Sequence, residues 1–166
     1  VILVRVEEEY ASYSTKKRPA IPIIKEIIKN FGDEEIVVMG RYTTQVKHLK
    51  QIFGNKIRIL NKVVDGKILL RNADVFIGSG GTMTAESALS SVPTISYNAV
   101  PNIIENYLVR KKLIIRERNP KRIVISIKKL LDSSNSEIKI KSKNMLRSME
   151  DPYPVLIETI NSVLKH

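Results

Sequence analysis

Short runs of valine and isoleucine alternate with amphipathic segments along most of this 166-residue chain. The runs are continuously apolar, which is typical of strands buried on both faces of a parallel sheet. From Ala20 to Phe31, by contrast, apolar side chains recur with the spacing of one helical face. The predicted strands are Val1–Val6, Ile36–Met39, Ile57–Leu60, Val75–Ile77, Thr94–Ser96 and Leu113–Ile115.

Strands separated by helices form right-handed βαβ units, because a right-twisted strand that feeds a helix packs back onto its sheet only that way. About six such strands predict an α/β fold, namely a doubly wound, Rossmann-like parallel sheet with helices on both faces. We expect the strand order 3-2-1-4-5-6. Ligands of such sheets bind beyond the carboxyl ends of the strands, so the residues that follow each strand are the candidates for a functional site.

The length of the chain suits one hydrophobic core, so residues 1–166 are interpreted as a single domain. In residues 132–166 a polar break precedes two predicted helices, which we expect to pack on the domain. The chain opens a strand at Val1 without a polar lead-in, which favours the second half of a longer protein with an N-terminal partner domain. The inner face of the last helix is predicted to hold Leu156, Ile160, Val163 and Leu164.

The composition excludes several classes of site. The chain has no cysteine, which excludes disulfides, thiolate nucleophiles and sulfur-ligated zinc. Neither His48 nor His166 has the sequence neighbours of a catalytic triad or a metal site, and no metal is expected. No apolar run approaches the roughly 20 residues that cross a bilayer, and the first residues do not form a secretory signal, so we expect a cytoplasmic protein.

The net charge of the chain is +11, from 28 Lys and Arg against 17 Asp and Glu, and it suits an anionic partner. The basic residues are spread evenly over both halves, and the aromatic residues form no cluster on which bases could stack. We therefore do not expect nucleic acid as the partner, although a basic nucleic-acid-binding or interaction module is an alternative. Peripheral contact of the basic surface with a membrane stays open.

The loop after the fourth predicted strand carries the strongest functional signal. The strand leads into Gly78, Ser79, Gly80, Gly81 and Thr82, and a helix is predicted to follow directly. Backbone amides freed by glycines, together with the positive end of a helix, form a cradle for phosphate. A turn that merely needs permissive glycines is the alternative, but three glycines in four residues exceed that need. The loop lacks the lysine of a P-loop, and it does not follow the first strand as a dinucleotide-binding loop does.

Three charged residues are further candidates for this site. Arg5 and Arg41 lie at the ends of the first two strands, where a guanidinium can bind phosphate or pair with the glutamates at positions 7–9. Glu86 lies one turn into the helix after the glycine loop. Its carboxylate could accept both hydroxyls of a ribose, or could simply stabilise the helix N-terminus. We identify no catalytic residue.

The run from Ala73 to Ala88, followed by Val92–Tyr97, resembles the C-terminal domain of GT-B glycosyltransferases and of the related UDP-N-acetylglucosamine 2-epimerases. The shared pattern is a strand, a glycine-rich turn, a helix with a glutamate, and a strand led by proline. The chain is also similar to DUF354, a family of unknown function with a Gly-Gly-Thr-Met-Thr core. The segment Val4–Tyr13 and the Glu-Asp-Pro sequence at 150–152 resemble that family as well.

This resemblance implies the nucleotide-sugar-binding half of a GT-B-type glycosyltransferase-like protein, with a UDP-type ligand and no other cofactor. The glycine loop would take the diphosphate, Glu86 the ribose, and the loop at Lys62, Val63 and Val64 the base. Tyr97 and Asn98 would lie on the side of the sugar.

The resemblance also implies that catalytic groups and the acceptor site come largely from an N-terminal domain, so this domain alone is expected to be inactive. The 2-epimerases carry Gln and paired acidic residues after the glycines, where this chain has Met83-Thr84-Ala85. An epimerase-like half is therefore the alternative and a transferase-like donor site the main expectation.

Overall fold

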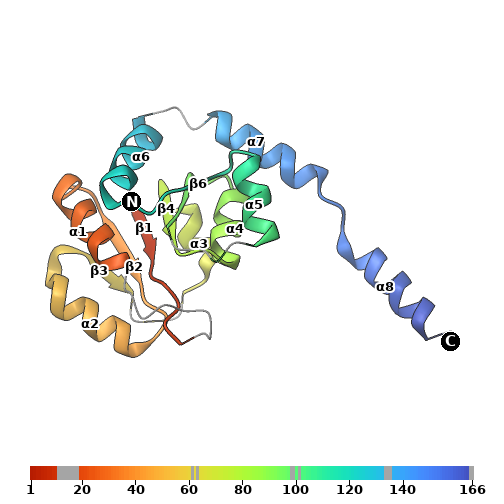
Figure 1. Ribbon diagram of the computed structural model, residues 1–166, viewed down its shortest axis with the longest axis horizontal. Helices are drawn as coiled ribbons and strands as arrows, with labels where there is room; N and C mark the ends of the chain where they lie inside the picture. The colour runs from red at the N-terminus through yellow and green to blue at the C-terminus, as the bar shows by residue number, and fades with distance from the viewer. Residues whose placement is uncertain are drawn as a thin grey trace.

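The computed structural model describes residues 1–10, 19–60, 62, 64–97, 100, 102–132 and 136–164. They form a parallel sheet covered by helices, with one further helix that extends outward (Figure 1). The strands are β1 (Ile2–Arg5), β2 (Ile36–Met39), β3 (Arg58–Leu60), β4 (Val75–Gly78), β5 (Thr94–Ser96) and β6 (Ile114–Arg116). The helices are α1 (Ala20–Asn30), α2 (Thr43–Phe53), the 3-10 turn η1 (Gly54–Lys56), α3 (Gly66–Arg71), α4 (Thr82–Leu89), α5 (Ile103–Arg110), α6 (Pro120–Asp132), α7 (Ser136–Ser148) and α8 (Pro152–Val163).

The strands pair in the order β3-β2-β1-β4-β5-β6, and every pair is parallel. This confirms the predicted α/β class, the strand number and the strand order. At the centre, Val4 of β1 lies opposite Val38 of β2 and Ile77 of β4. Because all strands run the same way, their carboxyl ends share one edge of the sheet, and chain order changes direction between β1 and β4 at that edge.

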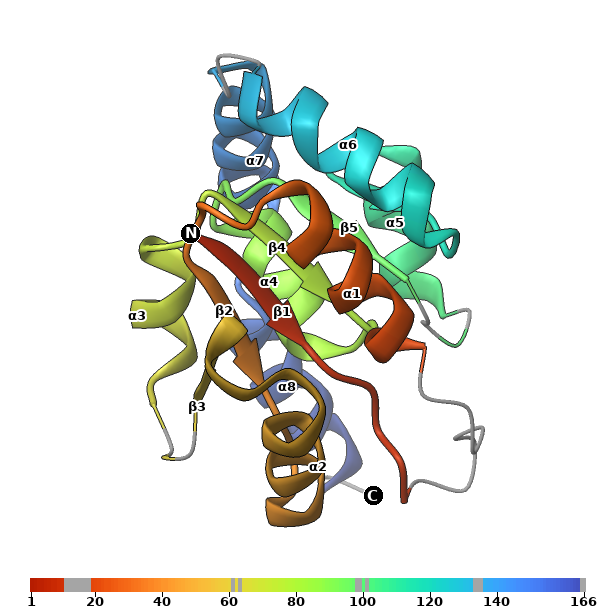
Figure 2. The same ribbon diagram turned by 90° about the vertical axis from the view of Figure 1, so that its left-hand side faces the viewer.

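Both faces of the sheet are buried, which explains why the strands are continuously apolar. Ile2 and Val4 of β1 pack in one core with residues of α1, α2 and α6, whereas Leu3 packs in a second core with residues of α3 and α4. Figure 2 shows α1 in front of the sheet and α4 behind it. A third core joins α4 to α5 and β6.

The two C-terminal helices behave differently. Helix α7 packs on the domain, where the fully buried Ser142 hydroxyl donates a hydrogen bond of 2.7 Å to the Ala88 carbonyl of α4. Helix α8 has no buried residue and extends away from the sheet (Figure 1). The expectation that it packs on the domain is therefore wrong in this structure: the predicted inner face is exposed at Leu156, Ile160, Val163 and Leu164. Amphipathic spacing shows that a helix has an apolar face, but not which surface covers that face.

In the described part of the chain, no helix is both long and apolar enough to span a membrane.

Candidate functional site

The N-terminus of α4 lies at the carboxyl edge of the sheet and faces open space. Gly80 and Gly81 have φ values of 95° and 84°, in the left-handed region that favours glycine. Gly81 is the N-cap, so Thr82 is the first helical residue and the helix has no side-chain cap. A Cβ atom at Gly81 would meet no heavy atom within 4 Å. The Thr84 amide donates to the Gly81 carbonyl at 3.1 Å, so the Thr82 and Met83 amides are the ones that a ligand on this side could meet.

The first glycine of the loop is required for packing. Gly78 is buried at the end of β4. A Cβ atom there would lie 2.5 Å from the Thr84 hydroxyl oxygen and 2.6 Å from the Phe76 ring. Gly78 therefore permits close packing between β4 and α4, and Gly80 is buried beside it. Ser79 is half-buried, and only Gly81 and Thr82 of the predicted loop are exposed.

A cavity of about 790 Å³ opens next to this helix end, and we call it the basic cavity. It lies where the carboxyl ends of β1, β2 and β3 meet the starts of α2, α3 and α4. Its wall carries five arginine or lysine side chains and one glutamate. The residues that line it are Arg5, Glu8, Met39, Gly40, Arg41, Tyr42, Thr43, Val46, Lys47, Lys50, Leu60, Lys62, Val64, Gly66 and Met83.

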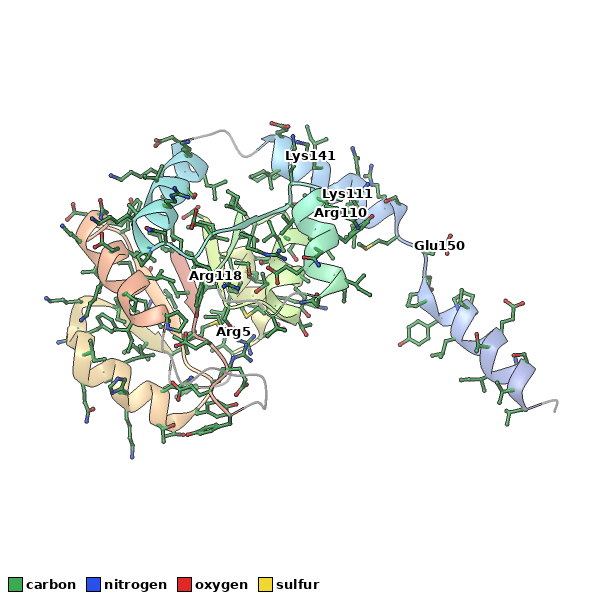
Figure 3. All side chains as sticks on the ribbon, viewed as in Figure 1. Arg5, Arg110, Lys111, Arg118, Lys141 and Glu150 are labelled. Carbon is green, nitrogen blue, oxygen red and sulfur yellow. The ribbon has the colours of Figure 1, made fainter. Side chains whose placement is uncertain are left out.

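Arg5 lies at the end of β1, next to α4 (Figure 3). Its guanidinium Nη1 contacts the Met83 sulfur at 3.0 Å. Burial is the main cause that lowers the pKa of Arg5; the neighbouring Arg41 guanidinium lowers it further, while Glu86 and Glu8 oppose this. Arginine stays charged even so. A half-buried cation beside a second cation is well suited to an anionic ligand, which would relieve both the burial cost and the repulsion.

Hydrogen bonds to the segment after β1 and to α2 position Arg41. Its Nε donates to the Val6 carbonyl at 3.3 Å, and its backbone amide donates to Gln45 Oε1 at 2.8 Å. Glu8 Oε2 lies 3.9 Å from the Arg41 guanidinium, so the predicted alternative of pairing with a glutamate is present in a weak form. The Tyr42 hydroxyl donates to Glu8, and this is the main cause that lowers the pKa of Glu8.

The other predicted ligand contacts are partly brought together. Lys62 and Val64 line the basic cavity, whereas Val63 lies outside the described residues. Glu86 is exposed on α4, and its charge acts on Arg5, which places it near the same cavity. Asn98 also lies outside the described residues.

Tyr97 does not lie on the wall of this cavity as a sugar contact would. Its side chain is 1% exposed, and its hydroxyl donates to Glu7 Oε2 at 2.9 Å, with the Arg5 carbonyl oxygen 3.1 Å from the same hydroxyl. Burial raises the pKa of Tyr97 well above its usual value and, for the same reason, raises the pKa of Glu7. Glu7 also accepts a hydrogen bond from the Ala20 amide at the start of α1. Tyr97 and Glu7 therefore hold the ends of β1 and β5 together beneath the site.

A second cavity, of about 780 Å³, lies on the other side of the α4 N-terminus, and we call it the α4–α5 cavity. Its wall is mostly apolar. The residues that line it are Gly81, Thr82, Thr84, Ala85, Asn102, Ile103, Ile104, Glu105, Leu108 and Ile114. The predicted diphosphate contacts are therefore divided: the two arginines line the basic cavity, while Gly81 and Thr82 line the α4–α5 cavity.

The sequence reasoning missed the contribution of α2 and of Met83 to the basic cavity. Lys47 and Lys50 line it from one side of α2. Their spacing of three residues, on a helix that begins just after β2 at the carboxyl edge, is a signal that could have found them. Nothing in the sequence shows that the Met83 side chain contacts Arg5, because that contact depends on how α4 packs. Within the residues that the structure describes, no group of three or more His, Asp or Glu side chains could hold a metal ion.

Comparison with solved structures shows the fold. The glycosyltransferase SnogD from Streptomyces nogalater has 16% identity and a TM-score of 0.59, over 96% of this chain and 41% of that one. The UDP-GlcNAc 2-epimerase of Methanocaldococcus jannaschii, in complex with UDP-GlcNAc and UDP, has 16% identity and a TM-score of 0.62, over 88% and 44%. The spinosyn rhamnosyltransferase SpnG, complexed with spinosyn aglycone, has 17% identity and a TM-score of 0.67, over 96% and 44%. The chain therefore has the Rossmann-like fold of GT-B proteins.

Comparison of sequences shows the family. An uncharacterised protein of Methanocaldococcus jannaschii is 30% identical over 157 residues, which are 93% of this chain and 42% of that protein. The chain thus spans less than half the length of this curated relative. The model of a family described as "Protein of unknown function (DUF354)" matches residues 1–165. The chain belongs to the DUF354 family.

Proposed function

We propose that the chain is the nucleotide-sugar-binding half of a GT-B-type glycosyltransferase-like protein, and that it takes a UDP-type sugar in the basic cavity. The observation that carries this proposal is the position of Arg5 and Arg41 on the wall of a 790 Å³ cavity that Met83, in the first turn of α4, also lines. Two guanidinium groups and a helix N-terminus next to one cavity suit a diphosphate.

The rest of the cavity suits a nucleoside. Lys62 and Val64 offer a polar and an apolar contact beyond β3, where a base would lie, and Glu86 is available to a ribose on the side of α4. The names of similar structures support the ligand class, since the epimerase of M. jannaschii is in complex with UDP-GlcNAc and UDP. The volume of the cavity falls within the usual range for small-molecule sites.

In the proposed reaction, an acceptor hydroxyl oxygen forms a bond to the anomeric carbon of the sugar and loses its proton to a base. The bond between that carbon and the diphosphate oxygen breaks, and negative charge develops on the leaving diphosphate. The amides at the start of α4 and the Arg5 guanidinium would stabilise that charge. Groups that activate the acceptor are proposed to come from an N-terminal partner domain. The described domain alone should therefore bind the nucleotide and turn over no substrate.

Isothermal titration with UDP and UDP-GlcNAc tests the proposal. We expect saturable binding that Arg5→Gln or Arg41→Gln weakens about tenfold or more, because each charge-assisted hydrogen bond contributes about 1.5–3 kcal/mol. Arg71→Gln is the matched control: it removes the same charge from an exposed position at the end of α3, on the opposite edge of the sheet. No binding at millimolar UDP, or an equal loss in all three variants, would contradict the proposal.

A further inference from the structure

The net charge of the chain is concentrated in one segment. Residues 110–147 hold 13 of the 28 Lys and Arg residues but 3 of the 17 Asp and Glu residues, which gives 13 − 3 = +10. The rest of the chain has 15 basic and 14 acidic residues, and so a net charge of +1. The segment covers the end of α5, β6, α6 and most of α7, and it shares no residue with the basic cavity.

Eight of these cations lie at the amino edge of the sheet, opposite the edge that carries the basic cavity. Helices α5 and α6 each follow a strand and run back to the amino edge, so residues 110–112 and 128–129 lie there. Helix α7 meets the end of α6 at the same edge (Figure 2) and carries Lys139, Lys143 and Arg147. The spacing of four residues places these three on one side of α7. We call the eight residues the basic edge.

The end of α5 and the start of α7 meet at one glutamate. Glu137 Oε1 accepts a hydrogen bond of 2.5 Å from Lys141 Nζ, which is the main cause that lowers the pKa of Glu137, and the charge of Lys112 lowers it as well. Figure 3 shows Arg110 and Lys111 on α5 close to Lys141 on α7. The cations of the two helices therefore form one continuous surface.

The cations of the basic edge are exposed and have no acidic partner. All eight side chains are exposed, and none of them forms a salt bridge with another residue of the described ranges. Because like charges that lie close together repel each other, an anionic partner would be attracted to this surface.

Exposed aliphatic side chains lie among these cations. Ile140 is 59% exposed and lies two residues from the buried Ser142, so it is on the outward side of α7, while Leu146 is 56% exposed. Residues 110–147 contain no Phe, Tyr or Trp, so this segment offers no side chain on which bases could stack. Cations interspersed with exposed aliphatic side chains are typical of surfaces that bind the headgroup region of a membrane. The pattern favours a membrane over nucleic acid.

We propose that the basic edge binds the surface of a membrane that contains anionic lipids. The lysine and arginine side chains reach the lipid phosphates, and Ile140 and Leu146 enter the boundary between headgroups and acyl chains. The basic cavity opens at the opposite edge of the sheet and stays accessible from the aqueous side. The two surfaces share no residue, so this inference does not rest on the proposed function.

Co-sedimentation of the full chain with lipid vesicles tests the proposal. The probes are vesicles of phosphatidylcholine with about 30% phosphatidylglycerol and vesicles of phosphatidylcholine alone. We expect at least tenfold tighter binding to the anionic vesicles, because each cation near such a surface gains electrostatic attraction. Raising the salt from about 0.1 M to about 1 M shortens the Debye length from about 10 Å to about 3 Å and should weaken this binding at least tenfold.

Two charge variants locate the surface. The double substitution Lys143→Gln and Arg147→Gln should weaken binding to the anionic vesicles at least tenfold. The matched control, Lys25→Gln and Lys56→Gln, removes the same charge from exposed side chains that line one pocket beside α1 and η1. These lie near β3, at the other end of the strand order from β6, so the control should change binding by about twofold or less.

A third variant tests the aliphatic contact. Ile140→Ser should weaken binding to the anionic vesicles at least threefold, because binding to the interface increases with the buried apolar area. Ile68→Ser, at a 54% exposed position on α3, is the matched control and should leave binding unchanged.

Lack of binding to the anionic vesicles, equal binding to both kinds of vesicle, or equal effects of a variant and its matched control would overturn the inference. Tighter binding of an RNA oligonucleotide than of the anionic vesicles, with the same loss in Lys143→Gln and Arg147→Gln, would also overturn it and assign the surface to nucleic acid. A parallel titration with UDP keeps the proposed function separate. UDP binding without vesicle binding would contradict only the membrane surface, and vesicle binding without UDP binding would contradict only the nucleotide site.

Discussion

The Tyr97 hydroxyl donates a hydrogen bond of 2.9 Å to the buried carboxylate of Glu7 and so connects the end of β5 to the segment that follows β1. The two residues are 90 positions apart in sequence. Gln45 of α2 donates to the Glu7 carbonyl at 2.9 Å, so three elements of the carboxyl edge meet at one glutamate. The shape of the basic cavity depends on this contact, because Glu8, which follows Glu7 directly, and Arg5, two residues before it, both line the cavity.

The Tyr97→Phe substitution should lower the free energy of unfolding by about 1–3 kcal/mol, because it leaves a buried carboxylate oxygen with one donor fewer. Urea denaturation measures the loss. Tyr107→Phe is the control, since the Tyr107 hydroxyl contacts the weakly accepting sulfur of Met145 at 3.2 Å, and it should cost about 0.5 kcal/mol or less. Equal losses in the two variants would show that the Glu7 contact contributes no stability.

The pH dependence of stability should reveal the buried state of Glu7. Burial raises its pKa in the folded protein, so the folded state holds this proton more tightly than the unfolded state does. Stability from this group is therefore greatest below the unfolded pKa of about 4.3 and falls as the pH rises towards the raised folded pKa. Relative to Glu7→Gln, the wild type should lose stability over that window in urea titrations. Parallel pH profiles would contradict the assignment.

The two ends of the glycine loop should respond differently to substitution. Gly81→Ala places a side chain at a φ of 84° in open space, so it should cost about 1–2 kcal/mol of stability and weaken UDP binding at least tenfold. Gly78→Ala collides with Thr84 and Phe76 and should cost about 1–3 kcal/mol or more. The fraction of the Gly78→Ala protein that still folds should bind UDP as the wild type does. Isothermal titration of both variants with UDP checks this difference in binding. Normal UDP binding by Gly81→Ala together with weakened binding by Gly78→Ala would place the phosphate at Gly78.

Helix α8 should contribute little to the stability of the domain. The double substitution Leu156→Asp and Ile160→Asp should change the free energy of unfolding by no more than about 0.5 kcal/mol, because both side chains are exposed. Ser142→Ala on α7 removes a buried hydrogen bond and should cost about 0.5–1.5 kcal/mol. A large loss from the α8 variant would mean that its apolar face is covered in solution.

The fold could be predicted from sequence because it follows from local patterns. Runs such as Ile36–Met39 are short and apolar at every position, which is typical of a strand covered on both sides, and the predicted bounds of this strand are those observed. The order of the strands was predicted because 3-2-1-4-5-6 is the usual order of a doubly wound sheet of six parallel strands.

The details of the site could not be predicted in the same way. Three consecutive glutamates at 7–9 look equally polar in the sequence, yet tertiary packing buries Glu7 and leaves Glu8 half-exposed. Tyr97 follows a strand directly, as a ligand-binding residue would, but the path of the chain after β5 turns its side chain into the core. Similarly, Gly78 is packed against Phe76 and Thr84, which lie on different elements, whereas Gly81 of the same loop faces open space. The sequence does not show these contacts.

A crystal structure of the chain with UDP tests the central claim most directly. We expect the diphosphate between Arg5 and the first turn of α4, with oxygens within hydrogen-bond distance of the backbone amides of Thr82 or Met83, and the uracil beside Val64. UDP bound at any other surface, or an unoccupied basic cavity at saturating UDP, would contradict the account.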